Sequence, residues 1–120
     1  MLVVRTYIAQ SAINGFGVFA YEPIPAGTLV WQFTPGIDLE ISEERLAALP
    51  ISAQEFLRHF INQTAPGMYL LCADNARFMN HSDAPNISSA DDRNNALRDI
   101  PVGTEIVCDY REFDVGFVGF

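Results

Sequence analysis

A short turn motif occurs twice in this sequence, and each copy runs into a strand-like segment. The first copy is Ile24–Thr28 (Ile-Pro-Ala-Gly-Thr) and the second is Ile100–Thr104 (Ile-Pro-Val-Gly-Thr). Proline and glycine stand where a tight turn needs them, and alternating residues follow as in a strand. Two such corners in a chain of 120 residues predict a mostly β architecture with two similar corners. They do not predict a solenoid, which needs about three repeats or more.

The other expected strands are runs rich in β-branched, aromatic and apolar residues. In the last of them, Tyr110 shares a face with Ile106 and Cys108, so its ring should be at least partly buried. The polar segment Ser88–Asn95 is expected to be a loop. With the strands after the two corners included, the expected strands are Val3–Ile8, Gly15–Ala20, Thr28–Phe33, Met68–Ala73, Ala96–Asp99 and Glu105–Tyr110.

Two short helices are expected in an insert at about residues 38–66. Ser42, followed by two glutamates, predicts the start of the first helix, and Pro50 ends it. Ser52 and Glu55 predict a capping box for the second helix. Its apolar residues recur at helical spacing and predict a core-facing stripe, made of Ala53, Phe56, Leu57, Phe60 and Ile61. The expected fold class is therefore α+β, mainly β with a small helical insert.

The charge limits the kinds of partner. The formal net charge is −8, and all seven positive side chains are arginine. Direct nucleic-acid binding is not expected, because neutralising phosphates needs clustered Lys and Arg. A basic peptide or protein fits this charge better.

One domain, residues 1–120, is expected from the length, because two domains would each be too small for a core. Cys72 and Cys108 are too few for a disulfide scaffold and lack the paired spacing of a zinc site, so no metal is expected. The first apolar residues meet Arg5 too soon for a signal peptide, and no run approaches the length of a membrane span. A cytoplasmic location is therefore expected. An exposed edge strand or the aromatic tail, residues 111–120, could support a homodimer.

Polar side chains collect directly after the Met68–Ala73 run. Asn80, His81 and Asn86 can donate and accept hydrogen bonds in several directions, which suits a polar ligand or a tightly crossed piece of backbone. Earlier in the chain, Gly15–Gly17 (Gly-Phe-Gly) lets the backbone approach a neighbour or a ligand, or serves as a hairpin turn. The residues alone leave these alternatives open.

Three motifs together resemble the SET domain, the fold of protein lysine methyltransferases that use S-adenosylmethionine. Gly15–Ala20 is similar to the family's G-x-G strand, and Arg77–Asn86 to its R-F-x-N-H-S-x-x-P-N segment. Gly103–Tyr110 is similar to its G-E-E-L-x-x-D-Y segment, with Thr104 in place of the first glutamate. The resemblance runs from about Arg5 to Tyr110. It implies a β-clip of several short sheets in which the last two motifs cross as a pseudoknot, a rare topology.

The resemblance also implies roles for single residues. Tyr110 would be the catalytic tyrosine, placed where the cofactor and the substrate lysine meet. The S-adenosylmethionine site would be formed by Gly15, Phe16, Gly17, Arg77, Phe78, Asn80 and His81. The channel for the substrate lysine would be formed by Phe33, Tyr69, Tyr110 and Phe113.

The sequence departs from the family pattern in ways that keep a second function open. The zinc-binding cysteine clusters that flank many members are missing, so this would be a short stand-alone SET domain. Phe113, Phe117 or Phe120 would cap the channel instead. The first hypothesis is a protein lysine methyltransferase acting on a basic protein or peptide. The alternative is a catalytically weak or inactive SET-like module that binds a basic peptide or protein partner, and a third, weaker possibility is methylation of a small amine.

Overall fold

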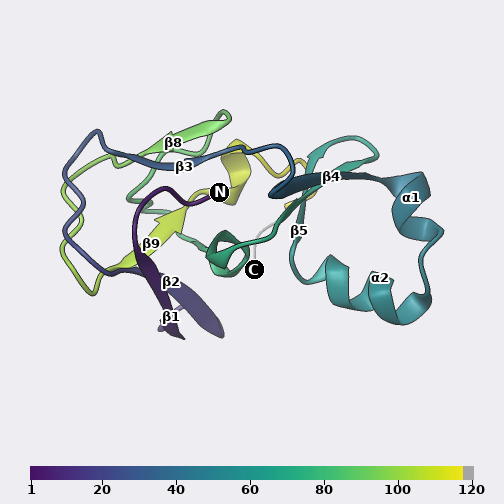
Figure 1. Cartoon of the computed structure of the whole chain (residues 1–120), viewed down its shortest axis with the longest axis horizontal. Coiled ribbons are helices and arrows are strands. Elements are labelled where there is room, and N and C mark those ends of the chain that lie inside the picture. The colour runs from purple at the N-terminus through teal and green to yellow at the C-terminus, as the bar shows by residue number, and fades with distance from the viewer. Residues whose placement is uncertain (118–120) are drawn as a thin grey trace.

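The computed structural model describes residues 1–117 and shows a β-rich body from which an insert projects to one side (Figure 1). The fold is mainly β with two small helices, as the sequence predicted. In chain order, the elements are β1 (Thr6–Gln10), β2 (Phe16–Ala20), β3 (Leu29–Gln32), β4 (Asp38–Ser42), α1 (Glu43–Ala47), α2 (Ile51–Arg58), β5 (Ile61–Ala65), β6 (Met68–Cys72), the 3-10 helix η1 (Asn75–Phe78), β7 (Asn80–His81), β8 (Arg93–Asn95), β9 (Glu105–Cys108) and the 3-10 helix η2 (Tyr110–Glu112).

The body is organised around β9, which lies between strands from distant parts of the chain. Its four-stranded sheet has the order β1-β2-β9-β7. β9 is antiparallel to β2 and parallel to β7, while β3 and β8 form a separate two-stranded sheet. The core is formed by the buried side chains of Val18, Ala20, Ile24, Val30, Met79, Ile87, Ala96, Ile100, Ile106 and Cys108.

The two repeated corners pair with each other. The N–H of Ile24 donates to the carbonyl of Ile100 at 2.9 Å, and the N–H of Ile100 donates back to the carbonyl of Ile24 at 2.8 Å. Gly27 and Gly103 have φ values of 83° and 80°, which a side chain would strain. The prediction of two similar corners is confirmed, and their mutual hydrogen bonds join two segments that are far apart in the sequence.

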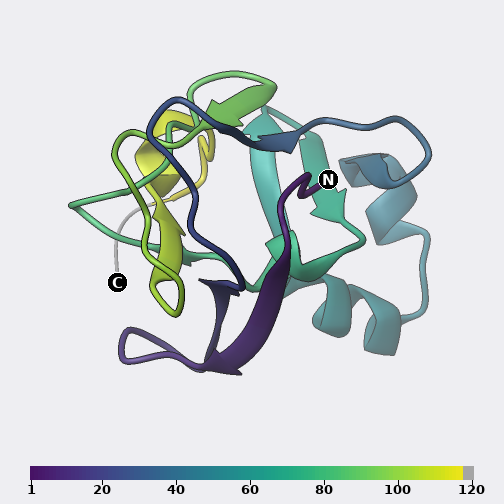
Figure 2. The same ribbon diagram turned by 60° about the vertical axis from the view of Figure 1, so that its left-hand side comes forward.

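The insert is a small sheet that ends in the two helices. Its strand order is β4-β6-β5, and Figures 1 and 2 show α1 and α2 at the end away from the body. The first helix begins as predicted, because the hydroxyl of Ser42 accepts the N–H of Arg45 at 3.1 Å. Leu46 is the only buried residue of α1. It anchors this helix to the insert.

The second helix differs from the prediction in its start and in its burial. α2 begins directly after Pro50, with no side-chain hydrogen bond to its first turn. Ser52 already lies inside the helix, so the predicted capping box with Glu55 is wrong. The predicted core-facing stripe is also wrong in part, because no residue of α2 is buried and Phe56 is 54% exposed. The helix lies at the tip of a small insert, where there is too little chain to cover its apolar side.

Three strands contradict the sequence prediction, and two of them, β5 and β8, are rich in polar residues. β4 and β5 lie in the segment predicted to be only helical, and β8 lies in the predicted loop Ser88–Asn95. The predicted strand Ala96–Asp99 is wrong, and β9 ends at Cys108, before Tyr110. These strands form because their backbones pair with β6 and β3, and polar side chains are tolerated where one face meets solvent.

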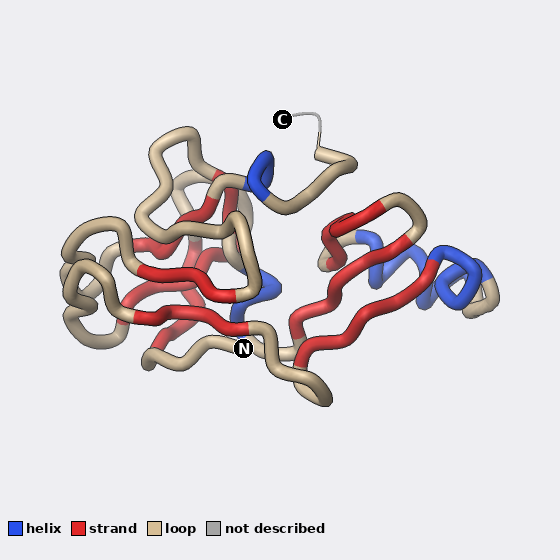
Figure 3. The backbone as a smooth tube through the Cα atoms, turned by 90° about the horizontal axis from the view of Figure 1, so that it is seen from above, coloured by secondary structure: helices blue, strands red, loops and turns tan. Residues whose placement is uncertain are grey.

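Seen from above, the body and the insert are separate groups of strands, and the chain after η2 extends toward the insert (Figure 3). Within residues 1–117, no helix is long and apolar enough to cross a membrane.

Candidate functional site

The second and third motifs lie side by side where β7 pairs with β9. Asn80 is opposite Val107 and His81 is opposite Cys108 in a parallel register. The pairing extends beyond His81, because the N–H of Ser82 donates to the carbonyl of Cys108 at 2.9 Å. The predicted meeting of two segments far apart in the sequence is therefore present.

Asn86 serves the crossed backbone. Its side-chain nitrogen donates to the carbonyl of Glu105 at 2.8 Å, and its side-chain oxygen accepts the N–H of Val107 at 2.9 Å. The residue is 3% exposed. Both ends of this amide are used, so Asn86 holds β9 in place.

Asn80 is also buried, but only one end of its amide is used. Its side-chain nitrogen faces three acceptors, the carbonyls of Asn14 and Phe16 at 3.1 and 3.0 Å and the Glu105 carboxylate at 3.0 Å. Its side-chain oxygen accepts no hydrogen bond from any residue in 1–117. The same side chain therefore ties the glycine-containing turn to β9 and leaves one polar atom for a ligand.

His81 positions the backbone of the predicted catalytic tyrosine. Its Nδ1 accepts the N–H of Tyr110 at 3.1 Å, and its Nε2 lies 3.2 Å from a carboxylate oxygen of Asp83. A nitrogen that accepts a backbone N–H carries no proton, so the neutral ring has its hydrogen on Nε2, directed to Asp83. The imidazole thereby fixes the start of η2.

The hydroxyl of Tyr110 donates to the backbone carbonyl of Met79, the residue before Asn80. The ring is half-buried, as predicted, and packs on Phe113 and Phe117 with centroid distances of 5.7 and 5.3 Å. Burial, with smaller contributions from Cys108 and Asp114, raises the pKa of Tyr110 well above its usual value. The phenol is therefore neutral at physiological pH, a hydrogen-bonding group and not a base.

The two glycines of the first motif are needed for different reasons. Gly15 has a φ of 51° and nothing within 4 Å of the place where a Cβ would lie. A Cβ on Gly17 would lie 2.5 Å from a carboxylate oxygen of Glu105. Both predicted roles of the motif are therefore observed: Gly15 forms a turn with positive φ, and Gly17 allows a close approach of a neighbour. The close neighbour of Gly17 is the carboxylate that also binds Asn80.

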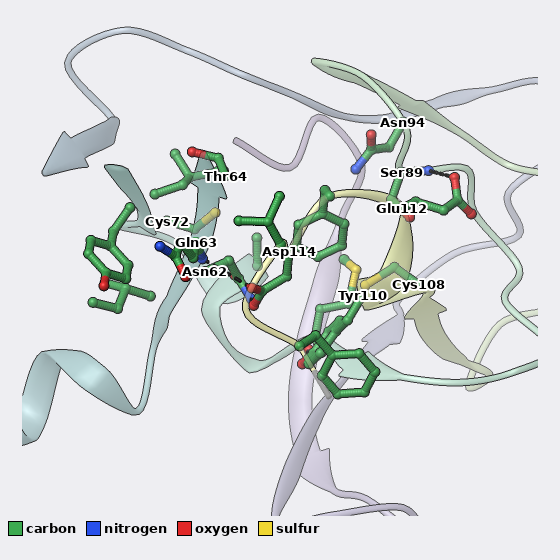
Figure 4. Close-up of a pocket in the computed structure, with 18 of the residues that line it drawn as sticks. Asn62, Gln63, Thr64, Cys72, Ser89, Asn94, Cys108, Tyr110, Glu112 and Asp114 are labelled. Carbon is green, nitrogen blue, oxygen red and sulfur yellow. Dashed lines mark hydrogen bonds between the residues drawn. The ribbon is translucent and has the colours of Figure 1, made fainter. Parts of the chain in front are cut away.

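A cavity of about 710 Å³ lies between the insert and the body. In Figure 4, Asn62, Gln63 and Cys72 of the insert lie on one side of it, and Tyr110, Glu112 and Asn94 of the body lie on the other. This volume is within the usual range for small-molecule sites, about 300–1,000 Å³.

The cavity includes part of the residue set expected from the sequence. Arg77, Tyr69, Tyr110 and Phe113 line it, and Phe33 does not. The other residues expected to bind the cofactor do not line it either, and these are Gly15, Phe16, Gly17, Phe78, Asn80 and His81. They lie at the turn between β1 and β2, at the end of η1 and on β7. The roles given to all these residues stay predictions.

Aromatic contacts connect the glycine-containing turn to the cavity. The exposed ring of Phe16 contacts Phe78 edge to face at 6.5 Å, and Phe78 contacts Phe60 at 5.6 Å. Phe60 lines the cavity, and the guanidinium of Arg77 lies over its ring at 5.2 Å. An apolar wall therefore runs from the turn to the cavity. With the free oxygen of Asn80, it suits a ligand that has an apolar body and a polar, hydrogen-bond-donating end.

The tail after η2 closes one side of the cavity. Asp114 accepts a hydrogen bond from the side chain of Asn62 at 3.1 Å, and the N–H of Val115 donates to the carbonyl of Gln63 at 2.8 Å. The ring of Phe117 lies 4.8 Å from that of His81. The expected docking of the aromatic tail is thus present for residues 111–117, whereas Phe120 lies outside the described residues.

The cavity is lined by more acidic than basic groups. Its acidic residues are Asp91, Asp92, Glu112 and Asp114, and its basic residues are Arg77 and Arg111. The hydroxyl of Tyr69 hydrogen-bonds Glu43, and this bond raises the pKa of the phenol. A cavity with this lining favours a cationic ligand over an anionic one.

The thiols offer no reactive or metal-binding sulfur. Burial raises the pKa of Cys72 to about 12 and raises the pKa of Cys108 well above its usual value, and it is the thiolate that binds metals and attacks. In the part of the chain that is described, no three His, Cys, Asp or Glu side chains are grouped to hold a metal ion.

Sequence reasoning missed several residues of this site. Glu105 was noticed only as part of the third motif, and Ser11 and Asp114 were given no role. A glycine two positions after another glycine did signal a close neighbour, but the neighbour is supplied by a strand distant in the sequence.

Comparisons with known proteins agree with this geometry. The model of the SET domain family matches residues 15–111, whereas no curated protein matches the chain significantly. The chain is similar to a subunit in a humanized mutant of the Chaetomium thermophilum Polycomb Repressive Complex 2, solved with an inhibitor, with a TM-score of 0.67 and 21% identity. That match covers 94% of this chain and 16% of the larger one.

A second solved structure has nearly the same length as the matched region. It is a Plasmodium falciparum protein described as a candidate histone methyltransferase, with a TM-score of 0.61 and 22% identity. The match covers 89% of this chain and 93% of that one. At these identities, both structures establish a shared fold and nothing more.

Proposed function

The chain belongs to the SET domain family, and from this premise we propose that it is a protein lysine methyltransferase that transfers a methyl group from S-adenosylmethionine to a lysine amine of a protein substrate. One observation carries the proposal. The hydroxyl of Tyr110 and the carbonyl of Met79 meet at the wall of the cavity, and the next residue, Asn80, binds the glycine-containing turn. Such a junction can hold a cofactor on one side and a substrate amine on the other.

The residues present fit S-adenosylmethionine. The side-chain oxygen of Asn80 can accept a hydrogen bond from its ammonium group, and the apolar wall of Phe16 and Phe78 can cover its apolar surface. S-adenosylmethionine supplies a methyl group already activated by a positive sulfur, so that transfer is an in-line displacement by a neutral amine, with the S–C bond pair left on sulfur. Alignment is then the main contribution of the protein.

The substrate amine must lose its proton before it can react. Keeping a free lysine, pKa about 10.4, neutral at pH 7 costs roughly 4 to 5 kcal/mol. The rings of Tyr110, Phe113 and Phe117 form an apolar surface, and such a surface disfavours the ammonium form of a bound lysine and lowers its pKa. Tyr110 itself stays protonated, so it orients the amine and does not remove the proton.

The second candidate is a catalytically weak or inactive module that binds a basic peptide or protein. One observation favours it, the hydrogen bond between the Tyr69 hydroxyl and Glu43. The acidic lining suits a basic partner in both candidates, so binding of a basic peptide does not separate them.

Two measurements separate the candidates. The first is isothermal titration with S-adenosylhomocysteine, and the second is transfer of a labelled methyl group to a cell extract that is then split into protein and small-molecule fractions. Label in a lysine of the protein fraction supports the proposal. Because the chain contains no lysine, the enzyme cannot label its own side chains. Binding without transfer supports the binding module, label only in small molecules supports an amine metabolite, and no binding at millimolar ligand refutes the cofactor site.

Tyr110→Phe tests the proposed centre directly. It removes only the hydroxyl that meets Met79, so turnover should fall by about a hundredfold, the size of a modest misplacement, while S-adenosylhomocysteine affinity changes little. Tyr7→Phe is the matched control, because Tyr7 lies on β1, away from the cavity, and it should change neither value. Equal turnover in Tyr110→Phe and wild type would contradict the role given to Tyr110.

A further inference from the structure

We propose that the N-terminal segment, residues 1–3, holds the insert in a fixed position against the body, and that Asp38 and Asp74 are the positioning residues through which it does so. The inference goes beyond the methyltransferase reaction, because it concerns what sets the width of the cavity. Only its effect on substrate binding rests on the proposed function.

The N-terminal segment is an added strand beside β3. Leu2 pairs with Trp31 in an antiparallel bridge, and the N–H of Gln32 donates to the carbonyl of Met1 at 3.0 Å. The side chain of Leu2 also packs against the core. The segment is therefore part of the body.

The same segment contacts both places where the chain passes between the body and the insert. Asp38 is the first residue of β4, which enters the insert, and Asp74 lies between β6 and η1, where the chain leaves it. The backbone nitrogen of Met1 donates to the Asp38 carboxylate at 2.6 Å, and the N–H of Leu2 donates to the Asp74 carboxylate at 2.7 Å. Figure 3 shows the N-terminal end at this junction. Two successive backbone nitrogens thus join the body to both connections of the insert.

The carboxylate of Asp38 depends on this contact. Its side chain is fully buried, and one of its oxygens, Oδ1, has no hydrogen-bond partner within residues 1–117. The other oxygen, Oδ2, accepts the nitrogen of Met1 and, at 2.9 Å, the N–H of Thr34. A buried carboxylate is costly unless it is well bonded, so loss of the contact with Met1 would destabilise this position of β4.

Asp74 carries the contact to the wall of the cavity. Its second oxygen, Oδ1, accepts the N–H of Ala76 at 3.1 Å at the start of η1. Ala76 and Arg77 line the cavity. Cys72, opposite Asp38 in the pairing of β4 with β6, lines it too. Because the cavity lies between the insert and the body, a rotation of the insert about these two connections would change its width.

A matched pair of variants at Leu2 isolates the contact. Leu2→Pro removes the leucine side chain and also the N–H that binds Asp74, because proline has no N–H. Leu2→Ala removes the side chain and keeps the N–H, so it is the control. Asp74→Ala, which removes both hydrogen bonds of this carboxylate, is the second variant and is compared with the wild type. It decides the question if urea unfolding shows that Leu2→Pro is not folded.

Electron paramagnetic resonance of two spin labels measures the position of the insert without any ligand. The labels are attached at Ile51→Cys in α2 and at Val102→Cys in the body, where the native side chains are 69% and 59% exposed. Burial raises the pKa of both native thiols, Cys72 and Cys108, so the new thiols react first. The wild type and Leu2→Ala should give one narrow distribution of distances, and Leu2→Pro and Asp74→Ala a broader one. Equal distributions in the folded variants and their controls would overturn the proposal.

The consequence for the cavity is measured by methyl transfer to poly-L-lysine. KM for this acceptor should be about tenfold higher in Leu2→Pro than in Leu2→Ala, the size of one hydrogen bond. S-adenosylhomocysteine affinity should be equal in the pair, because the hydrogen bonds of the segment within residues 1–117 run to β3, Asp38 and Asp74. Equal KM values would refute the effect on the cavity. If the wild type transfers no methyl group, the proposed function fails instead, and the label distances alone decide the role of the segment.

Discussion

Replacing Gly17 by alanine should destabilise the domain, and the loss should depend on Glu105. The new Cβ would lie 2.5 Å from one oxygen and 2.8 Å from the carbon of the Glu105 carboxylate. The carboxylate cannot move away freely, because Ser11 and Asn80 both donate to it. Overpacking costs about 1–3 kcal/mol, and a displaced carboxylate would weaken hydrogen bonds of about 1.5–3 kcal/mol each. We expect Gly17→Ala to lower the free energy of unfolding by about 2–3 kcal/mol.

A double-mutant cycle tests this cause. In a Glu105→Ala background the obstacle is gone, and Gly17→Ala should change the free energy of unfolding by about 0.5 kcal/mol or less. The coupling between the two positions should then be about 2 kcal/mol. Urea unfolding can be followed by the fluorescence of Trp31, the single tryptophan, which is 7% exposed and therefore reports on the folded state.

Gly15→Ala is the control, because it sits in the same motif but is strained for another reason. Its φ of 51° disfavours a side chain, at a cost of about 1–2 kcal/mol, and nothing near it can clash. This cost should be equal with and without Glu105. If Gly17→Ala is also equally destabilising in both backgrounds, the steric account of Gly17 is refuted.

Three further variants test the crossing, the start of η2 and the insert. Asn86→Ala leaves the Glu105 carbonyl and the Val107 N–H unpaired, so the free energy of unfolding should fall by about 2–4 kcal/mol, and an unchanged urea midpoint would contradict its role. The hydrogen bond from Arg111 lowers the pKa of Asp109 from 3.8 to about 2. The stabilisation that ionised Asp109 gives to the folded state is therefore complete above pH 3.8 and is lost as the pH falls toward 2. Asp109→Asn should lose less stability over this pH range than the wild type does. Leu46→Ala opens the buried contact of α1 and should cost about 2–5 kcal/mol, measured by the same urea unfolding.

The sequence predicted the parts of the fold that local chemistry determines. The repeated corners follow from proline and glycine, and the start of α1 follows from Ser42 and the glutamates after it. β5 and β8 were missed because asparagine, glutamine and arginine give no alternating apolar pattern, and their pairing is decided by the strands beside them. The burial of Phe56 was overpredicted because helical spacing shows which side of α2 is apolar, not whether the insert is large enough to cover it.

The candidate site was predictable as a set of segments, not as a set of contacts. The three motifs identify β2, β7 and β9 as neighbours, and the resemblance gives Tyr110 and Asn80 their expected roles. The sequence does not say which end of Asn80 is free, because that depends on Glu105, which follows it by 25 positions in the chain. Nor does it show that Phe33 lies outside the cavity, since that depends on how β3 pairs with β8.

The two buried asparagines distinguish what the fold requires from what a ligand requires. Asn86 uses both ends of its amide on the backbone of β9, so the fold alone accounts for it. The nitrogen of Asn80 faces two carbonyls of the turn and the Glu105 carboxylate, whereas its oxygen accepts no hydrogen bond from residues 1–117. The turn and Glu105 therefore account for the nitrogen of Asn80, and its oxygen is the atom that the described residues leave without a hydrogen bond.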